Sequence, residues 1–362
     1  MQDEIEQVNG TGNGGSAVEL REAFYILGLG TLVVAILYFA GDILAPITLA
    51  VLIWFLINAI ANGLRAMPVI GRLMGLGFAL TLASVVVIGA IVGVGQLVAS
   101  NFSELAQGLQ GLDKKIADAV NGGAGYLGVT LQLDIQQEIE NLPLEQLLQT
   151  VVEAVSSTAS NISMVILFVL FLLLDQPFFD VKIRALFPDQ ARQSRVRHVL
   201  AKISEDTRAY VWIMTVVSVL VGLSTYVIAA SFGLKGAAFW GFTAFAFNYI
   251  PTIGTAIGVA LPALFGLVQF DDYAALGLMV ALLAGFQFLL GNILLPRMTG
   301  GRLNLSEFVV VLSLLVWGAL WGGMGLFLGV PMVMVMAIIF AQFDSTRPVA
   351  ILLSKNGRVM KA

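Results

Sequence analysis

The 362-residue sequence contains no cysteine and only one histidine. Without thiols it forms no disulfide framework, thiol nucleophile or thiolate metal site, and a single histidine excludes a multi-histidine metal centre. It also contains no Walker motif, no Ser/His/Asp set, no pair of buried carboxylates and no phosphate-cradling loop. We therefore expect no enzyme, no catalytic residue, no cofactor and no metal, and ATP is not expected to be the direct energy source.

Charged residues are also scarce. They make up 12% of the chain, whereas 58% of it is hydrophobic and the mean hydropathy is +0.92. A soluble domain is about 25% charged, so this composition predicts an integral membrane protein. Residues 1–21 are acidic and glycine-rich and lack the basic region and cleavage site of a signal peptide. They are expected to form a disordered cytoplasmic tail.

Long apolar runs are abundant. A helix rises about 1.5 Å per residue and the hydrocarbon core is about 30 Å thick, so roughly 20 apolar residues span it. Three such runs lie in residues 22–99, and single runs lie at 157–174, 210–230 and 273–295. The expected fold is an all-α integral membrane protein with about six full spans.

Two further apolar stretches, 237–270 and 308–343, are interrupted. The first is broken by NYIPTIG at 248–254 and the second by WGALWGG at 317–323. Irregular backbone at membrane depth is tolerated only where protein or a water-filled cavity surrounds it, so the pair points to a transport path. We interpret them as two inverted, re-entrant or broken helical hairpins in a transport core at 209–344. Two pairs of kinked helices around structural prolines and glycines are the alternative.

The basic residues predict the orientation of the chain. If the N-terminus is inside, only Lys114, Lys115 and Lys235 of the 19 lysines and arginines fall outside. Short cytoplasmic loops concentrate lysine and arginine. Both termini, including the tail at 345–362, are therefore expected in the cytoplasm.

Two segments are expected outside the membrane. Residues 100–156 are acidic, carry apolar residues at helical spacing and contain an NGGAG turn, which predicts a helical hairpin on the outer face. Its apolar stripe suits contacts with partner subunits, with ligand binding as the alternative. Residues 175–208 place basic residues around an apolar stripe and predict cytoplasmic amphipathic helices on anionic lipids. Nucleic-acid binding is not expected from so short a basic run in a membrane setting.

The first interruption supplies neutral polar groups for a substrate or ion path. Pro251 removes a backbone donor and Gly254 allows backbone geometries closed to other residues, so carbonyls near Tyr249 could face a ligand. Further neutral donors and acceptors come from Asn248, Thr252 and Thr255. These groups suit an uncharged polyhydroxyl molecule and also a partly dehydrated sodium ion. Alternatively, Asn248 only caps a broken helix end.

Two amides and three glycines complete the candidate path. Gln287 and Asn292 are the strongly polar residues of the sixth run and could face the first interruption, or they make a structural helix contact. Gly318, Gly322 and Gly323 lie in the second interruption. They allow either close packing of backbones or sliding of one hairpin during alternating access.

Carboxylates bear on ion coupling, because acids within a membrane are costly and usually functional. No acid lies at the centre of a predicted span. Asp175, at the inner end of the fourth run, and Glu307, at the start of the second interrupted stretch, are the candidates for coupling. Solvated residues at helix ends are the alternative.

Four motifs together resemble one family of bacterial transporters. They are NYIPTIG (248–254), GNILLPRMTGGRLNLS (291–306), LSLLVWGALWGGMGLFLGVP (312–331) and FLLLD (171–175). The chain resembles the autoinducer-2 exporter (AI-2E) family from about residue 20 to 344. The resemblance implies eight membrane segments counting the hairpins, homo-oligomers that look pentameric, and export of small signalling molecules or, in some members, cation/proton antiport.

The sequence departs from this family at two places. Glu307 stands where the family usually has proline, and Trp212 and Met214 replace polar residues near Tyr210. Both departures bear on the identity of the ligand and the coupling ion.

The function expected from these features is ion-coupled secondary transport. The chain would export a small polar signalling molecule such as autoinducer-2 across the bacterial inner membrane by alternating access. A sodium/proton antiporter is the first alternative, and a passive pore or a non-transporting membrane oligomer is the second. The expected partners are a small polar solute or cation, membrane lipids, and further copies of the chain.

Overall fold

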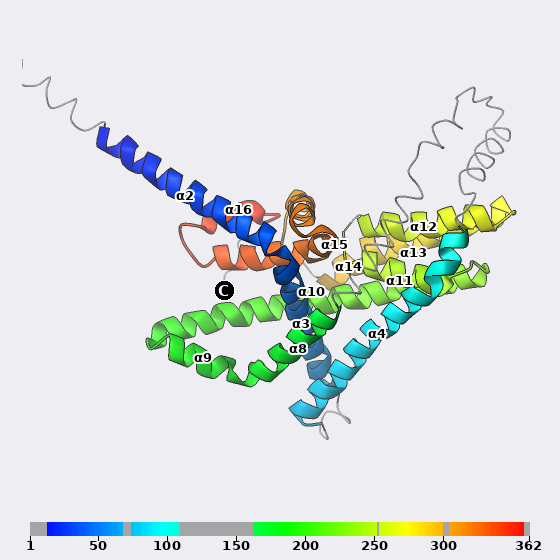
Figure 1. The fold of residues 1–362 in the computed structure, drawn as a ribbon, viewed down its shortest axis with the longest axis horizontal. Helices are drawn as coiled ribbons and strands as arrows, with labels where there is room; N and C mark the ends of the chain where they lie inside the picture. Colours follow the sequence, from blue (N-terminus) through cyan, green and yellow to red (C-terminus); the bar gives the residue numbers. More distant parts are fainter. Residues whose placement is uncertain (1–12, 68–73, 109–161, 252, 300–303, 358–362) are drawn as a thin grey trace, which may run out of the picture.

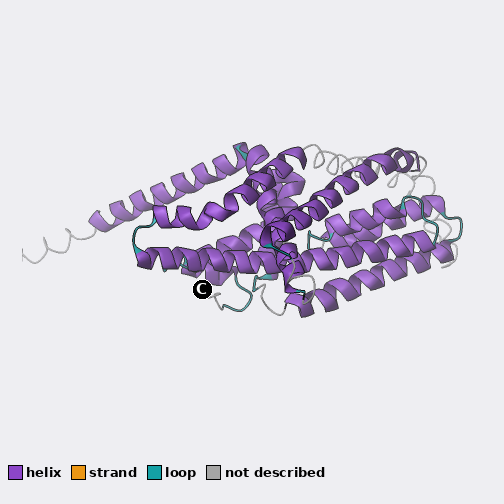
Figure 2. Cartoon of the chain, turned by 90° about the horizontal axis from the view of Figure 1, so that it is seen from below, coloured by secondary structure: helices purple, strands orange, loops and turns teal. Residues whose placement is uncertain are grey.

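The computed structural model describes residues 13–67, 74–108, 162–251, 253–299 and 304–357. These residues are helical, with no strand apart from one isolated bridge between Leu305 and Ser354 (Figure 2). Most of the outer segment at 100–156, both ends of the chain and Thr252 lie outside the described residues.

The first predicted spans are helices. They are α2 (Asn13–Phe39), α3 (Gly41–Ala66), α4 (Leu76–Gly108) and α8 (Ile162–Asp175). In Figure 1, α2 projects away from the other helices. In the described part of the chain, six helices are long and apolar enough to cross a membrane: Gly41–Ala66, Leu76–Gly93, Ile162–Leu186, Gln190–Ser231, Tyr273–Thr299 and Glu307–Phe340. The prediction of an all-α, multi-pass membrane protein is confirmed.

The longest element is α10 (Gln190–Ser231), with 42 residues. At about 1.5 Å per residue it is about 63 Å long, twice the thickness of the hydrocarbon core. The sequence predicts a boundary between a basic segment ending at residue 208 and a transport core beginning at residue 209. This boundary falls inside α10. The basic half therefore continues along the axis of the span instead of forming a separate helix.

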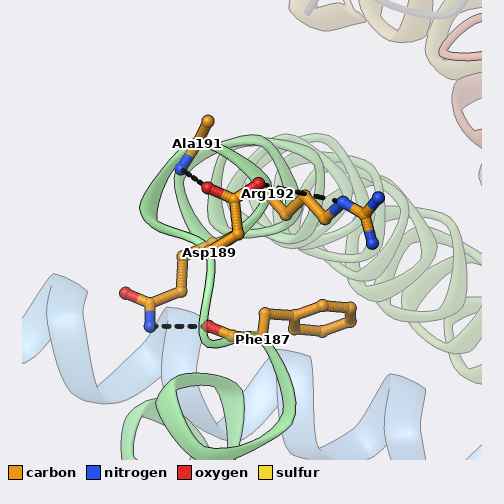
Figure 3. A network of polar contacts seen from close by, with 5 residues as sticks. Phe187, Asp189, Ala191 and Arg192 are labelled. Carbon is orange, nitrogen blue, oxygen red and sulfur yellow. Dashed lines mark hydrogen bonds and ion pairs between the residues drawn. The ribbon is translucent and has the colours of Figure 1, made fainter.

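A tight turn joins α10 to the preceding helices, η1 (Gln176–Phe178) and α9 (Phe179–Leu186). Asp189 Oδ1 accepts a hydrogen bond from the backbone N–H of Ala191 at 3.0 Å, which caps the N-terminus of α10 (Figure 3). The Gln193 amide donates to the carbonyl oxygen of Phe187 at 3.0 Å. The Arg192 Nε atom lies 3.8 Å from Asp189 Oδ2. Side chains on both sides of the turn thus fix where α9 ends and α10 begins.

The helices α11 (Ala237–Phe247) and α12 (Ile253–Gln269) form the first hairpin. Together with α13 (Tyr273–Phe288), they lie along the C-terminal half of α10 (Figure 1). Gly254 lies against the backbone carbonyl of Phe247, so the two arms fold back on each other. Where α10 crosses α11, a Cβ on Gly222 would lie 2.8 Å from the Gly241 carbonyl oxygen, and a Cβ on Gly241 would lie 2.8 Å from that of Gly222. Backbone packs directly on backbone at this crossing.

The second hairpin is contained in α15 (Glu307–Phe340), whose chain reverses at Gly322 with φ 61° and ψ −138°. Glycine adopts this conformation without the steric penalty of a Cβ. The Ser313 hydroxyl donates to the Gly329 carbonyl oxygen at 2.6 Å, and Gly325 lies against the carbonyl of Trp317. The two arms of α15 are therefore antiparallel and in contact.

The sixth predicted span is α13 (Tyr273–Phe288), followed by the π-helical turn η2 (Leu289–Leu294) and α14 (Leu295–Thr299). A π turn inside a longer helix often marks a functional site. The described chain closes with α16 (Arg347–Leu353), next to the start of the second hairpin, where Ser306 N–H donates to the Leu353 carbonyl oxygen at 3.0 Å.

A partly buried amide pair connects the C-terminal half of α3 to the corner after α8. Gln176 Nε2 donates to Asn58 Oδ1 at 3.0 Å, and Trp54 Nε1 donates to Gln176 Oε1 at 2.8 Å. The two helices are therefore joined by side-chain hydrogen bonds near these ends.

Candidate solute site

The apex of the first hairpin is fixed to α10 by two polar contacts. Asn248 Nδ2 donates to the Ser218 hydroxyl at 2.9 Å, and both side chains are buried. One turn earlier on α10, the Thr215 hydroxyl lies 2.8 Å from the Tyr249 hydroxyl. Asn248 is the C-cap residue of α11, where its backbone N–H donates to the Ala244 carbonyl oxygen, and its side chain bonds to α10. The apex is therefore docked on the surface of α10.

The same apex reaches the second hairpin. The ring of Tyr249 lies 4.6 Å from the ring of Phe327 at an interplanar angle of 40°, and 5.7 Å from Phe245 at 85°. Aromatic rings at such distances and angles attract each other beyond their burial. The first hairpin thus contacts the return arm of the second through Tyr249.

Gln287 on α13 is the least satisfied polar group in this region. Its side chain is 4% exposed, and neither Nε2 nor Oε1 has a hydrogen-bond partner in the structure. It lies against α12, because a Cβ on Gly258 would come within 2.6 Å of Gln287 Nε2 and 3.4 Å of Ala244 Cβ. A buried donor or acceptor without a partner costs about 1–3 kcal/mol. The wall of the first hairpin therefore presents an amide that a polar molecule would stabilise.

The second predicted amide lies in a different environment. Asn292 belongs to η2 and is exposed, so it does not share the buried environment of Gln287. Thr255 does face η2, because a Cβ on Gly291 would lie 4.0 Å from Thr255 Cγ2. Of these two amides, only Gln287 lies in the wall of the first hairpin.

The residues of the interruption have distinct roles. Pro251 is half-buried, and its carbonyl oxygen accepts from the Ile253 N–H at 2.7 Å. Thr252 lies outside the described residues. Gly254 does not have a positive φ. It is needed instead because any side chain would collide with the carbonyl of Phe247, which differs from the reason predicted from the sequence.

The three glycines of the second hairpin also separate by role. Gly322 makes the reversal. A Cβ on Gly318 would lie 2.8 Å from Leu326 Cδ2, so it permits close contact of the arms, whereas a Cβ on Gly323 would meet nothing within 4 Å. Close packing accounts for Gly318 and the turn accounts for Gly322, but no contact explains Gly323.

The two predicted coupling carboxylates lie in exposed ion pairs. Asp175 is 2.6 Å from Lys182, and Glu307 is 2.9 Å from Lys355, with carboxylate side chains 53% and 87% exposed. Both are outside the buried contacts between the hairpins and α10. No group of three or more His, Cys, Asp or Glu that could hold a metal ion occurs among the residues described.

A third carboxylate, Asp206, was missed by the sequence analysis. Its side chain is 9% exposed, and it lies in the N-terminal half of α10. It was overlooked because residues 175–208 were assigned to a surface helix. The available signal was the spacing of Asp206 with Tyr210, Ile213 and Val217, which continues the buried stripe of the predicted span toward the N-terminus.

In the residues that the structure describes, six helices of membrane length, two folded-back hairpins and a buried polar group in the wall of one hairpin indicate a multi-pass membrane protein of the transporter class. The profile of the AI-2E family transporters matches residues 27–344. The chain belongs to the AI-2E transporter family, as its motifs predicted.

Individual relatives agree with this assignment. The chain is 27% identical to AI-2 transport protein TqsA of Escherichia coli (strain K12), over 91% of this chain and 94% of that protein. It is 27% identical to YhhT of the same strain, which is named as a candidate transport protein, over 91% of this chain and 93% of that protein. A candidate transport protein of Haemophilus influenzae is 31% identical over 55% of this chain and 57% of its own.

Proposed function

We propose that this transporter is a secondary exporter of a small, uncharged, polar solute of the autoinducer-2 kind, working by alternating access and coupled to an ion. The observation that carries the proposal is Gln287, a buried amide with neither polar atom bonded. The similarity to TqsA, which is named as an AI-2 transport protein, supports this class of solute. We further propose the bacterial inner membrane, with both termini cytoplasmic and several copies of the chain assembled together, as the setting.

The chemistry of the site favours a neutral ligand. An amide supplies two N–H donors and a carbonyl acceptor, which match hydroxyl and carbonyl groups. The neighbours of the amide, Gly258 and Ala244, are uncharged. A solute with several hydroxyls would satisfy both ends of Gln287 and replace the hydrogen bonds it loses on leaving water.

Alternating access requires two packed elements that separate. The first hairpin contacts α13 through Gly258 and Gln287, α10 through Asn248 and the second hairpin through Tyr249. At the crossing of α10 and α11, Gly222 and Gly241 bring the two backbones together, with Phe245 and Tyr226 packed beside them. We infer that the first hairpin moves against α13 to expose Gln287 to one side at a time.

The test is transport of labelled autoinducer-2 into proteoliposomes, with and without an imposed ion gradient. In the wild type we expect accumulation only with the gradient. Gln287→Leu should abolish it while keeping or raising the thermal stability in detergent, because replacing an unsatisfied amide by a similar apolar group removes a buried polar cost.

Gln342→Leu is the matched control, since this amide lies at the far end of α15 and bonds its own helix at the Ile338 carbonyl oxygen, 3.4 Å away. It should transport normally. Wild-type rates in Gln287→Leu contradict the assigned site. Equilibration that ignores the gradient indicates a passive pore, and sodium/proton exchange without solute movement indicates an antiporter.

A further inference from the structure

Asp206 is a buried carboxylate with unused binding capacity. The residue is 9% exposed, and Oδ2 is buried with no hydrogen-bond partner. A buried carboxylate oxygen without a donor or cation is costly, more so than a neutral group. One oxygen of the buried Asp206 carboxylate is therefore able to accept a further hydrogen bond or a cation.

Its other oxygen has a weak internal partner. Lys202 Nζ lies 3.4 Å from Asp206 Oδ1, one turn earlier on α10. Charge-assisted hydrogen bonds of this type are about 2.7–2.9 Å long, so the ammonium is close but not tightly bonded. The Lys202 side chain is 29% exposed. It can therefore leave the carboxylate for water without being stranded in an apolar environment.

The position of Asp206 connects it to the rest of the transport core. Residues 7 and 11 positions apart lie on the same face of a helix, which places Asp206 in line with Ile213 and Val217. These two pack in a cluster with Ala244 of α11 and with Leu290 and Leu295 of the α13–η2–α14 segment. Asp206 thus lies at the inner end of the face of α10 that forms this apolar seam.

Gln287 lies at the same seam. It belongs to α13, three residues before Leu290, and Ala244, which lies in the seam, is also a neighbour of Gly258 at the Gln287 amide. A change at Asp206 that alters the packing of α10 on α14 would therefore be transmitted through contiguous side chains to the amide.

We propose that Asp206 is the binding site of a sodium-sized monovalent cation, with Lys202 as a built-in competitor that occupies the carboxylate when the cation is absent. A single carboxylate matches a single positive charge, and hard cations prefer oxygen ligands. Cation binding frees Lys202 to water and keeps the pair of charges balanced. The assignment rests on the proposed function, because it supplies the ion for the coupled export.

The test measures sodium binding directly on the purified full-length protein in detergent. A ligand that binds the folded state raises the thermal unfolding midpoint in proportion to its occupancy. We expect a saturable rise with sodium chloride that choline chloride at equal ionic strength does not reproduce. Asp206→Asn should weaken apparent sodium binding by roughly a hundredfold, since it removes the only charge of a buried ligand.

Lys202→Gln gives the sharper result. A purely structural ion pair predicts lower stability and no change in sodium response. The proposal predicts tighter sodium binding, by roughly tenfold, because the competing ammonium is gone. Asp180→Asn, which removes an exposed pair with Arg197, is the control and should leave the sodium response unchanged.

Three outcomes overturn the assignment: a wild type without a sodium-specific rise, an Asp206→Asn variant that retains it, or a Lys202→Gln variant without tighter binding. Solute transport measured in parallel separates the two proposals. Transport through Gln287 with no sodium effect rejects the cation site alone, whereas sodium binding without solute transport rejects the proposed solute.

Discussion

The ring of Tyr249, at the apex of the first hairpin, stacks on the ring of Phe327, on the return arm of the second, with centroids 4.6 Å apart. The two interrupted segments are separated in sequence by α13, η2 and α14, yet they meet at this pair. The Tyr249 hydroxyl also contacts Thr215 of α10. One side chain thus connects both hairpins to the longest helix.

Truncation of Tyr249 should uncouple transport. Tyr249→Ala removes the ring contacts to Phe327 and Phe245, a loss of about 3–5 kcal/mol for a buried aromatic, and we expect passive leakage of solute through proteoliposomes. Tyr249→Phe keeps the rings and loses only the Thr215 contact, so it should remain tight. Solute efflux without a gradient is the measurement. The exposed Tyr273→Ala is the control, and equal leakage in all three variants would reject the role of the stack.

Gly258 and Gln287 should be energetically coupled. Gly258→Ala places a methyl group within 2.6 Å of the Gln287 amide, so the side chain must move and transport should fall. Combining it with Gln287→Ala relieves the clash, and the double variant should be more stable than the sum of the single effects predicts, by about 0.5–3 kcal/mol. Thermal unfolding of the four proteins measures this coupling. Additive effects would mean that the two residues do not touch.

Gly322 and Gly323 provide a matched pair at the second reversal. Gly322→Ala forces a Cβ into a conformation with φ 61° and ψ −138°, which should cost about 1–3 kcal/mol. Gly323→Ala meets open space and should be neutral or slightly stabilising. The comparison of their unfolding midpoints checks the turn. Equal midpoints would show that the chain does not reverse at Gly322.

The proposed inversion of the hairpins can be tested with single cysteines, because the chain has none of its own. Ile253 at the first apex and Gly323 at the second are both exposed. If the hairpins enter from opposite faces, a membrane-impermeant thiol reagent should reach Ile253→Cys and Gly323→Cys from opposite sides in oriented vesicles. Labelling of both from the same side would favour two pairs of kinked, fully spanning helices.

The helical architecture was predictable because membrane spans follow from local composition. In a medium without water every backbone polar group must be bonded within the segment, so a run of about 20 apolar residues already determines a helix. The helix α8 ends at Asp175, one residue after the expected 174, and α13 begins at Tyr273, where the run was expected to begin. The interruption at 248–254 and the reversal at Gly322 were recognisable for a related reason, since proline and glycine break helices locally.

The structure carries one helix, α10, through the boundary predicted between residues 208 and 209. Charge in residues 190–208 indicated a surface helix separate from the span, but nothing in this segment breaks the helix. In this segment of α10 the buried residues are Asp206 and Thr207, at its C-terminal end. Burial depends on neighbours from distant segments, and the sequence of α10 alone contains no information about them.

The sequence by itself determined the class of this protein, its spans, its two interrupted segments and its family, because each depends on composition or on short motifs. Only the tertiary structure decided which polar residues are satisfied. It paired Asn248 with Ser218 and Gln176 with Asn58, left Gln287 and one oxygen of Asp206 without partners, and placed Asp175 and Glu307 at the surface. Hydrogen-bond satisfaction is a property of contacts between helices, so it arises only when the helices pack.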